Sequence, residues 1–153
     1  ELLLIASKSQ HIGEISYIIE AHSIFVFQCK AFDEENHMSE LEIEYLIRAL
    51  GIGATYRGYR YLNYGVKLCL RDEDYLLSVS KLLYPQIAKN YHTTSSSVER
   101  DIRTVIRVCW ERGNRRLLQE IALHPLDSQP TSSEFLDILT AHLRQKEAAE
   151  MLV

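Results

Sequence analysis

One stretch of the sequence restricts the possible folds more than any other, because it holds two helical patterns separated by a short polar turn. Pro85 is placed to begin a short helix over residues 85–91, since proline is favoured in the first turn of a helix. The polar run HTTS ends this helix, and a longer amphipathic pattern follows, in which one face holds Val98, Ile102, Val105, Ile106 and Cys109. A short helix, a turn and a longer helix in this order predict a helix-turn-helix motif.

Capping signals mark where the helices begin and end. Ser39 with Glu42, and Ser96 with Glu99, each have the spacing of a capping box, in which two side chains satisfy the free N–H groups of a helix start. Gly51 stands where a C-terminal glycine cap belongs. The sequence therefore predicts a helix that ends at Gly51 and a long helix over 96–112.

The rest of the sequence after residue 58 also has helical spacing and capping signals. Apolar spacing predicts helices over 59–72, 73–83 and 115–123, and Thr131 with Glu134 caps a last helix. The predicted inward side chains of this last helix are Phe135, Ile138, Leu139 and Leu143. Residues 40–153 are therefore expected to form a mainly all-α domain.

The first 36 residues have a different pattern. A strand-length apolar run, a helical pattern and a second run of β-branched and aromatic residues predict a β-α-β segment over 1–36. Residues 37–39, at the end of the polar run Asp33 to Ser39, are expected to be a linker to the helical domain.

Composition excludes several classes of protein. With 153 residues, 46% hydrophobic and 25% charged, the chain is ordinary globular material rather than a disordered or disulfide-framed one. No apolar run reaches the roughly 18 residues that a membrane span needs, so neither an anchor nor membrane binding is expected. Cys29, Cys69 and Cys109 stand far apart without a CxxC pair, which favours free thiols in the cytoplasm as core residues.

Enzymatic chemistry has no sequence signature here. The 6 histidines never fall into a metal-ligand spacing, and no catalytic motif or phosphate-binding lysine accompanies the glycines at 51–58. We therefore expect no metal, no cofactor and no catalysis. The dense tyrosines Tyr56, Tyr59, Tyr61 and Tyr64 could stack on single-stranded nucleic acid, but their helical spacing favours a role in the core, as does the setting of Trp110.

Positive charge is concentrated in the middle of the chain. Residues 75–126 hold 8 Lys and Arg against 4 Asp and Glu, whereas residues 1–74 hold 7 against 12 and residues 127–153 hold 2 against 5. A basic segment between acidic flanks is typical of a surface that binds a polyanion.

The basic residues of the long helix form a stripe. Ser96, Arg100, Arg103 and Arg107 lie opposite its apolar face, which suits a helix laid into the major groove of DNA. Two alternatives stay open at this point. The stripe could be a solvated arginine face, and Glu99 could either pair with Arg103 or accept a hydrogen bond from cytosine.

The motifs around this helix are those of a known family. The runs IGATYRGYRYL, SVSKLLYPQIAKNYHTTSSSVERDIRTVIRVCWERGN and PTSSEFLDIL, in this order, resemble the C-terminal effector domain of the sporulation-initiation response regulator of endospore-forming bacteria. The resemblance spans about Glu40 to Gln145. It implies a six-helix DNA-binding domain whose fourth helix reads a promoter box in double-stranded DNA, and whose bound copies act on the RNA polymerase sigma subunit.

The resemblance also implies roles for individual residues. The family reads bases with an arginine, a glutamate and an arginine in SRVER; here the run is SSVER, so Glu99 and Arg100 match while Ser97 replaces the first arginine. Lys89, Arg103 and Arg107 are expected at phosphates. The expected DNA-binding set is Lys89, Thr93, Thr94, Ser96, Ser97, Glu99, Arg100, Arg103 and Arg107.

The N-terminal segment resembles the last strand-helix-strand portion of a receiver domain, with Lys30 at the receiver lysine and Ala31 in place of its proline. The whole chain is thus expected to be a transcription regulator that binds double-stranded DNA. We also expect a second copy of the chain to bind beside it on the DNA. The alternative is an interaction module of the same fold that has lost specific DNA reading and acts on the sigma subunit or on the true regulator.

Overall fold

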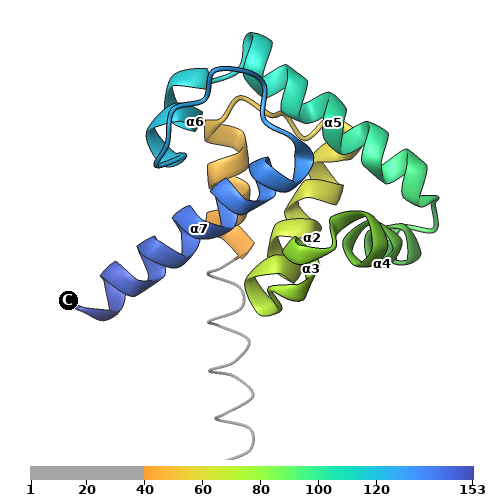
Figure 1. The fold of residues 1–153 in the computed structure, drawn as a ribbon, viewed down its shortest axis with the longest axis horizontal. Helices are drawn as coiled ribbons and strands as arrows, with labels where there is room; N and C mark the ends of the chain where they lie inside the picture. Colours follow the sequence, from red (N-terminus) through yellow and green to blue (C-terminus); the bar gives the residue numbers. More distant parts are fainter. Residues whose placement is uncertain (1–39) are drawn as a thin grey trace, which may run out of the picture. The chain divides into compact units, whose positions relative to one another are not determined.

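The computed structural model describes residues 40–153, and in this part of the chain nearly all regular structure is α-helical (Figure 1). Residues 40–49 are helical. The elements that follow are α2 (Arg57–Arg71), α3 (Asp74–Leu77), the π-helix η1 (Val79–Leu83), α4 (Tyr84–Asn90), α5 (Ser95–Arg112), α6 (Arg115–Ile121) and α7 (Ser132–Met151). No strand occurs between residues 40 and 153, so the all-α prediction is confirmed there. The predicted β-α-β segment 1–36 and the linker 37–39 lie outside the described residues.

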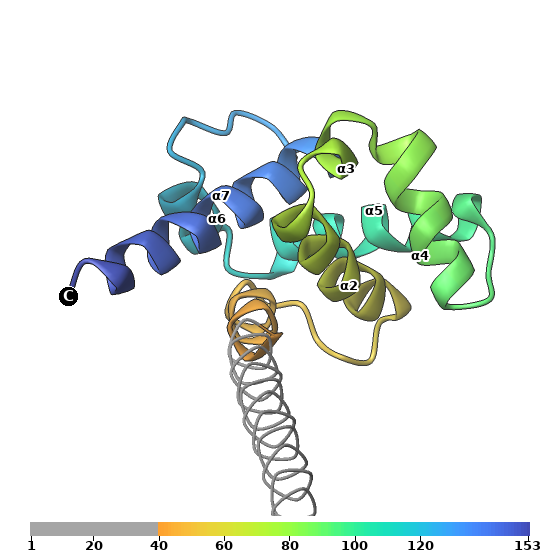
Figure 2. The same cartoon turned by 90° about the horizontal axis from the view of Figure 1, so that it is seen from below.

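The core is built around α2, which packs against α4, α5 and α7 (Figure 2). Its apolar stripe buries Leu62, Val66 and Cys69 completely. The buried face of α5 consists of the five residues that the sequence pattern predicted, Val98, Ile102, Val105, Ile106 and Cys109. The predicted inward face of the last helix is also confirmed, since Phe135, Ile138, Leu139 and Leu143 are buried. A helix with one apolar stripe is stable only when that stripe is covered, and these three helices cover one another.

The first turn of α2 touches the backbone of α5 directly. A Cβ atom at Gly58 would lie 2.2 Å from the carbonyl oxygen of Asp101 and 2.9 Å from a methyl group of Val105. Only glycine allows this approach. The contact fixes where the start of α2 lies along α5.

Two glycines join three helix ends. Gly51, at φ +86°, closes the helix 40–49, with the Gly51 N–H donating to the Arg48 carbonyl and the Ile52 N–H to the Ile47 carbonyl. The predicted glycine cap is thereby confirmed. Gly113 ends α5 as predicted, and a Cβ on it would lie 2.4 Å from the Leu50 carbonyl oxygen. Asn114, which caps α6, donates its backbone N–H to that same carbonyl at 3.0 Å.

The predicted Ser39–Glu42 capping box includes a residue outside the described range. The Glu42 carboxylate accepts from Lys146 of α7 at 2.7 Å. The third box is present, since Thr131 and Glu134 exchange both hydrogen bonds at the start of α7. Proline occupies the first turn of α4, as expected for Pro85. Cys69 and Cys109 are free and fully buried, as predicted, and burial raises the pKa of the two thiols to about 12 and about 11.

The prediction of one continuous helix over 73–83 is wrong. Ser78, at φ −143° and ψ 60°, interrupts it, so that α3 ends at Leu77 and the chain continues as the π-helix η1. The interruption turns Val79 and Leu83 inward while Leu77 remains 84% exposed. Leu82, predicted inward with them, is 46% exposed, so the wider π-helical turn follows the packing of the core rather than the local pattern.

Among the described helices, none has a stretch of the length and apolarity that crossing a membrane requires.

Candidate nucleic-acid interface

The turn between α4 and α5 has a defined geometry. The Tyr91 N–H donates to the Ile87 carbonyl and the Thr93 N–H to the Ala88 carbonyl, which closes α4 in the manner of a Schellman motif. His92 takes the left-handed position of this motif, at φ 51°, where glycine or asparagine is usual. The turn therefore sets the direction in which α5 leaves α4.

The helix α5 begins at Ser95, with Thr94 as its cap, and not at a Ser96–Glu99 capping box. The Thr94 hydroxyl oxygen accepts from the Ser97 N–H at 3.2 Å, and the Thr94 hydroxyl donates to the Ser97 hydroxyl at 3.0 Å. The predicted box is wrong because the Schellman turn already places Thr94 in the extended conformation of a cap residue. As a result, Ser97 is half-buried and engaged in the cap, while Ser96 is exposed.

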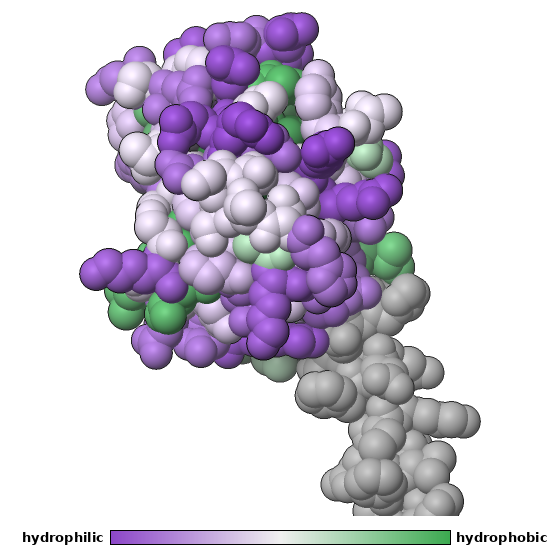
Figure 3. Space-filling model, turned by 90° about the vertical axis from the view of Figure 1, so that its right-hand side faces the viewer, coloured by the Kyte–Doolittle hydropathy of each residue, from purple (hydrophilic) through white to green (hydrophobic). Residues whose placement is uncertain are grey.

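The polar face of α5 is on the surface. Arg100, Arg103 and Arg107 are all exposed, and they lie opposite the buried residues of the same helix. Lys89, on the last turn of α4, is exposed as well. Figure 3 views the side of the molecule that carries α4 and the turn into α5, and hydrophilic side chains cover most of it. The structure thus brings the predicted site residues together along one helix and the turn before it.

Carboxylates lie beside two of the three arginines. Arg103 forms an ion pair with Glu99, one turn earlier, so this alternative reading of Glu99 is the one seen. Arg100 lies 3.4 Å from a carboxylate oxygen of Asp101, a long contact on a side chain that is 70% exposed. Within residues 40–153, Arg107 has no ion-pair partner. Exposed pairs of this kind are weak and break readily for a stronger anion.

Tyrosines of α2 pack against Tyr91, in the turn between α4 and α5. The Tyr91 ring meets Tyr61 edge to face at a centroid distance of 5.1 Å and Tyr64 at 5.9 Å. The Tyr91 hydroxyl donates to the Arg60 carbonyl at 3.3 Å, which ties the turn to α2, and burial raises the pKa of Tyr91. Tyr59 and Tyr61 are buried, which confirms their core role over a role in stacking on bases.

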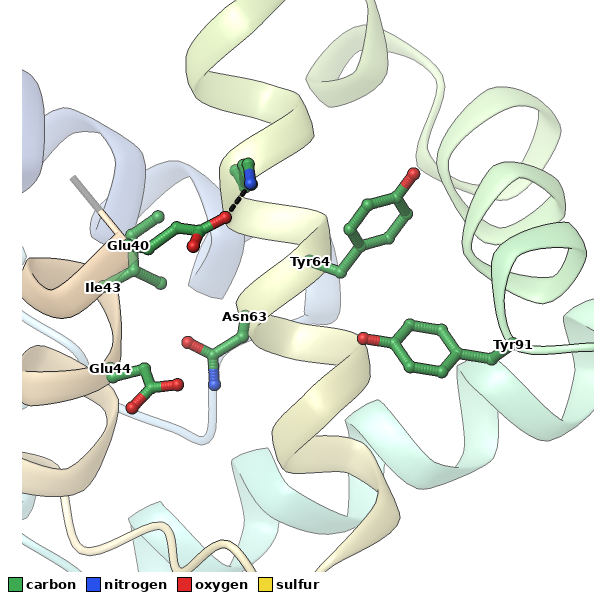
Figure 4. Close-up of a pocket in the computed structure, with 7 residues that line it drawn as sticks. Glu40, Ile43, Glu44, Asn63, Tyr64 and Tyr91 are labelled. Carbon is green, nitrogen blue, oxygen red and sulfur yellow. Dashed lines mark hydrogen bonds and ion pairs between the residues drawn. The ribbon is translucent and has the colours of Figure 1, made fainter. Parts of the chain in front are cut away.

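Tyr91 lies between two cavities of opposite charge. The first, of about 230 Å³, is lined by Glu40, Glu44, Asn63 and Tyr64, and Lys67 at its edge pairs with Glu40 (Figure 4). The second, of about 380 Å³, is lined by Arg57, Arg60 and Tyr61 and by the loop residues 54–56. The two arginines were not among the residues predicted from the sequence, although the run YRGYR places them on either side of Gly58.

A third cavity, of about 400 Å³, lies on the opposite side of α5. Its polar lining consists of Glu99 and Arg103 of α5, the Tyr84 side chain and the hydroxyl residues Thr131, Ser132 and Ser133 at the start of α7. Burial raises the pKa of Tyr84, whose hydroxyl is hydrogen-bonded to Ser132. This cavity is polar, and its single arginine is already paired.

Residues 40–153 contain no cluster of three or more histidine, cysteine, aspartate or glutamate side chains that could hold a metal ion. What the exposed face can bind is an extended anion that meets several arginines at once.

Comparison with known families agrees with this geometry. Residues 43–143 match the family described as sporulation initiation factor Spo0A C terminal. The match includes the helix-turn-helix, the tyrosines beneath it and the start of α7.

Proposed function

The chain belongs to the Spo0A C-terminal family, a family of DNA-binding domains of sporulation initiation, and on that premise we propose that it regulates transcription by reading a specific site in double-stranded DNA. In this proposal α5 lies in the major groove. Arg100 and Glu99 meet base edges, since they match the reading positions that the family resemblance implies. Arg103, Arg107 and Lys89 contact phosphates, and the polar residues Thr93, Thr94, Ser96 and Ser97 line the groove at the start of the helix.

The observation that carries the proposal is the two-faced character of α5. Five apolar side chains anchor the helix in the core, and the opposite face presents three exposed arginines over two turns. A major groove about 12 Å wide admits one helix, with its first residues at base edges and its later arginines at phosphates. The rigid turn before α5 supports this placement, because it leaves the helix start exposed and fixed in direction.

The partners follow from the same placement. We propose that two copies bind side by side on DNA and that the bound protein contacts the RNA polymerase sigma subunit. Duplexes selected from a random library, and the same duplexes with scrambled sequence, provide the test at fixed salt. A preference of 10³-fold or more for the selected duplex is the expected result for a specific regulator. Equal affinity for both would contradict specific reading.

The role of Arg107 has a direct test. Arg107→Ala is expected to weaken binding to selected and scrambled duplexes alike and to flatten the slope of log K against log salt by about one unit. Arg116→Ala is the matched control, because Arg116 is exposed and belongs to α6, outside the helix-turn-helix. A slope unchanged by Arg107→Ala would exclude a phosphate contact at this position.

One observation favours a second candidate function. Ser97 occupies the place of the family's first base-reading arginine, and it is hydrogen-bonded within the Thr94 cap. A domain that has lost one base contact could act as an interaction module on the sigma subunit or on the true regulator. Binding to purified sigma subunit without DNA, together with equal affinity for selected and scrambled duplexes, would favour this module over the regulator.

A further inference from the structure

The cavity at the start of α2 is a basic feature outside the polar face of α5. Arg57 and Arg60 are one turn apart on the same helix, and both line the cavity of about 380 Å³ together with Tyr61 and Tyr91. Both guanidinium groups are exposed, and within residues 40–153 neither has an ion-pair partner. The first turn of α2 holds no acidic residue. Two free guanidinium groups at one cavity are suited to an oxyanion with several acceptor oxygens.

The position of this cavity relative to α5 is fixed by backbone contact. Gly58, between the two arginines, is packed against the carbonyl of Asp101 in the second turn of α5. Helices that pack closely have axes 8–10 Å apart in general, and the major groove is about 12 Å wide. When one helix fills the groove, a helix packed on its side therefore lies over a wall of the groove, which is formed by phosphates.

The neighbouring charges distinguish this cavity from the other two. The cavity on the far side of Tyr91 carries Glu40 and Glu44, which repel an anion. The cavity towards α7 contains the Glu99–Arg103 pair, so its charges cancel. Of the three cavities, the α2 cavity alone has unopposed positive charge, and Tyr91 in its lining belongs to the turn that leads into α5.

We propose that the Arg57–Arg60 cavity binds a phosphate of the DNA backbone on one wall of the groove that α5 occupies. This inference rests on the proposed function and adds a second helix to the interface. The Tyr91 hydroxyl, which donates to the Arg60 carbonyl, holds the helix-turn-helix and this phosphate site in one register. Reading and anchoring thus come from segments about forty residues apart in the sequence.

The test uses the full chain with both arginines replaced, Arg57→Gln with Arg60→Gln, and the salt dependence of binding to a selected duplex. Loss of one phosphate contact is expected to reduce the slope of log K against log salt by about 0.9. The matched control carries Arg112→Gln with Arg116→Gln, which removes the same charge from exposed positions at the end of α5 and on α6. The control is expected to leave the slope within about 0.3 of the parent value.

A second measurement locates the phosphate. Single neutral methylphosphonates are placed one by one along the duplex; one position is expected to weaken binding of the parent protein but not of the Arg57, Arg60 variant. Unchanged slope and an unchanged methylphosphonate profile in a variant that binds DNA would overturn the cavity site and leave the proposed function standing. A parent protein that binds no duplex would overturn both.

Discussion

The two sides of α5 differ in both packing and charge. On the α2 side, Gly58 lies against the Asp101 backbone, and Arg57 and Arg60 are unpaired within the described residues. On the α7 side, α5 and the start of α7 line a cavity of about 400 Å³, and the one arginine there is paired with Glu99. The α2 side of the helix therefore has a direct backbone contact beside unpaired arginines, whereas the α7 side has a polar cavity whose charges are paired.

This difference assigns separate roles to the two sides of α5: the α2 side fixes its position, and the α7 side can rearrange. Backbone contact cannot be adjusted by side-chain rotation, so the α2 side sets the position of α5 in the molecule. Hydroxyl groups and an exposed ion pair can rearrange at little cost, so the α7 side can adapt to what α5 meets. Substitutions on each side test this comparison.

The largest effect is expected at the close contact. Gly58→Ala places a Cβ atom 2.2 Å from the Asp101 oxygen, so α2 and α5 have to move apart, and we expect the free energy of unfolding to fall by about 3 kcal/mol. Urea denaturation measures this change in the free energy of unfolding. Gly53→Ala is the matched control, since its Cβ would meet only the Thr55 hydroxyl at 3.7 Å, and a change below about 1 kcal/mol is expected. Equal losses in both variants would show that the contact does not hold the two helices.

The second effect concerns discrimination between DNA sequences. Ser97→Arg restores the family's arginine while the backbone N–H that completes the Thr94 cap remains. Binding to the family's box is expected to tighten by about 1–3 kcal/mol, and binding to scrambled duplex far less, because only the matched site offers a guanine edge. Ser96→Arg adds the same charge one residue away and is expected to tighten both complexes equally. If Ser97→Arg also acts equally on both, α5 is not docked as proposed.

The third effect tests how the start of α5 is held. Thr94→Ala removes the oxygen that accepts from the Ser97 N–H, and the expected loss of stability is about 1 kcal/mol. Thr55→Ala, at an exposed loop threonine, serves as the control for loss of a hydroxyl and methyl group. A stable Thr94→Ala variant, with the same unfolding midpoint as the parent, would place the cap elsewhere.

The smallest effect is expected on the neutral side of α5. Glu99→Gln releases Arg103, so the slope of log K against log salt for scrambled duplex is expected to steepen by about one unit at most. Glu120→Gln releases Arg116 from an equivalent pair four residues apart on α6 and is expected to leave the slope unchanged. An equal change in both variants would reflect net charge rather than the position of Arg103.

Features governed by neighbours in the sequence could be predicted. The glycine cap at Gly51, the proline start at Pro85 and the Thr131–Glu134 box depend on groups within a few residues, and the structure contains all three. The buried face of α5 was predictable for the same reason, because one period of 3.6 residues governs it.

Features that depend on contacts between residues far apart in the sequence could not be predicted. Ser96 and Glu99 have the spacing of a capping box, but the turn closed by Ala88 and Thr93 makes Thr94 the cap. The break at Ser78 and the π-helix after it have no signal in the local pattern, whose apolar spacing continues through 73–83. Arg57 and Arg60 were missed because their position beside α5 follows from the contact of Gly58 with Asp101, which no local pattern reveals.

The joint between Gly51 and Gly113 has a mechanical consequence. A Cβ at Gly51 would lie 2.7 Å from the Gly113 Cα, and the Asn114 N–H donates to the Leu50 carbonyl, so backbone meets backbone, and the Asn114 amide adds a hydrogen bond to the Ala49 carbonyl. A side-chain rotation cannot relieve the backbone contacts of this joint. Any side chain at Gly51 or Gly113 would therefore force the end of the helix 40–49 away from the end of α5, since neither backbone can give way.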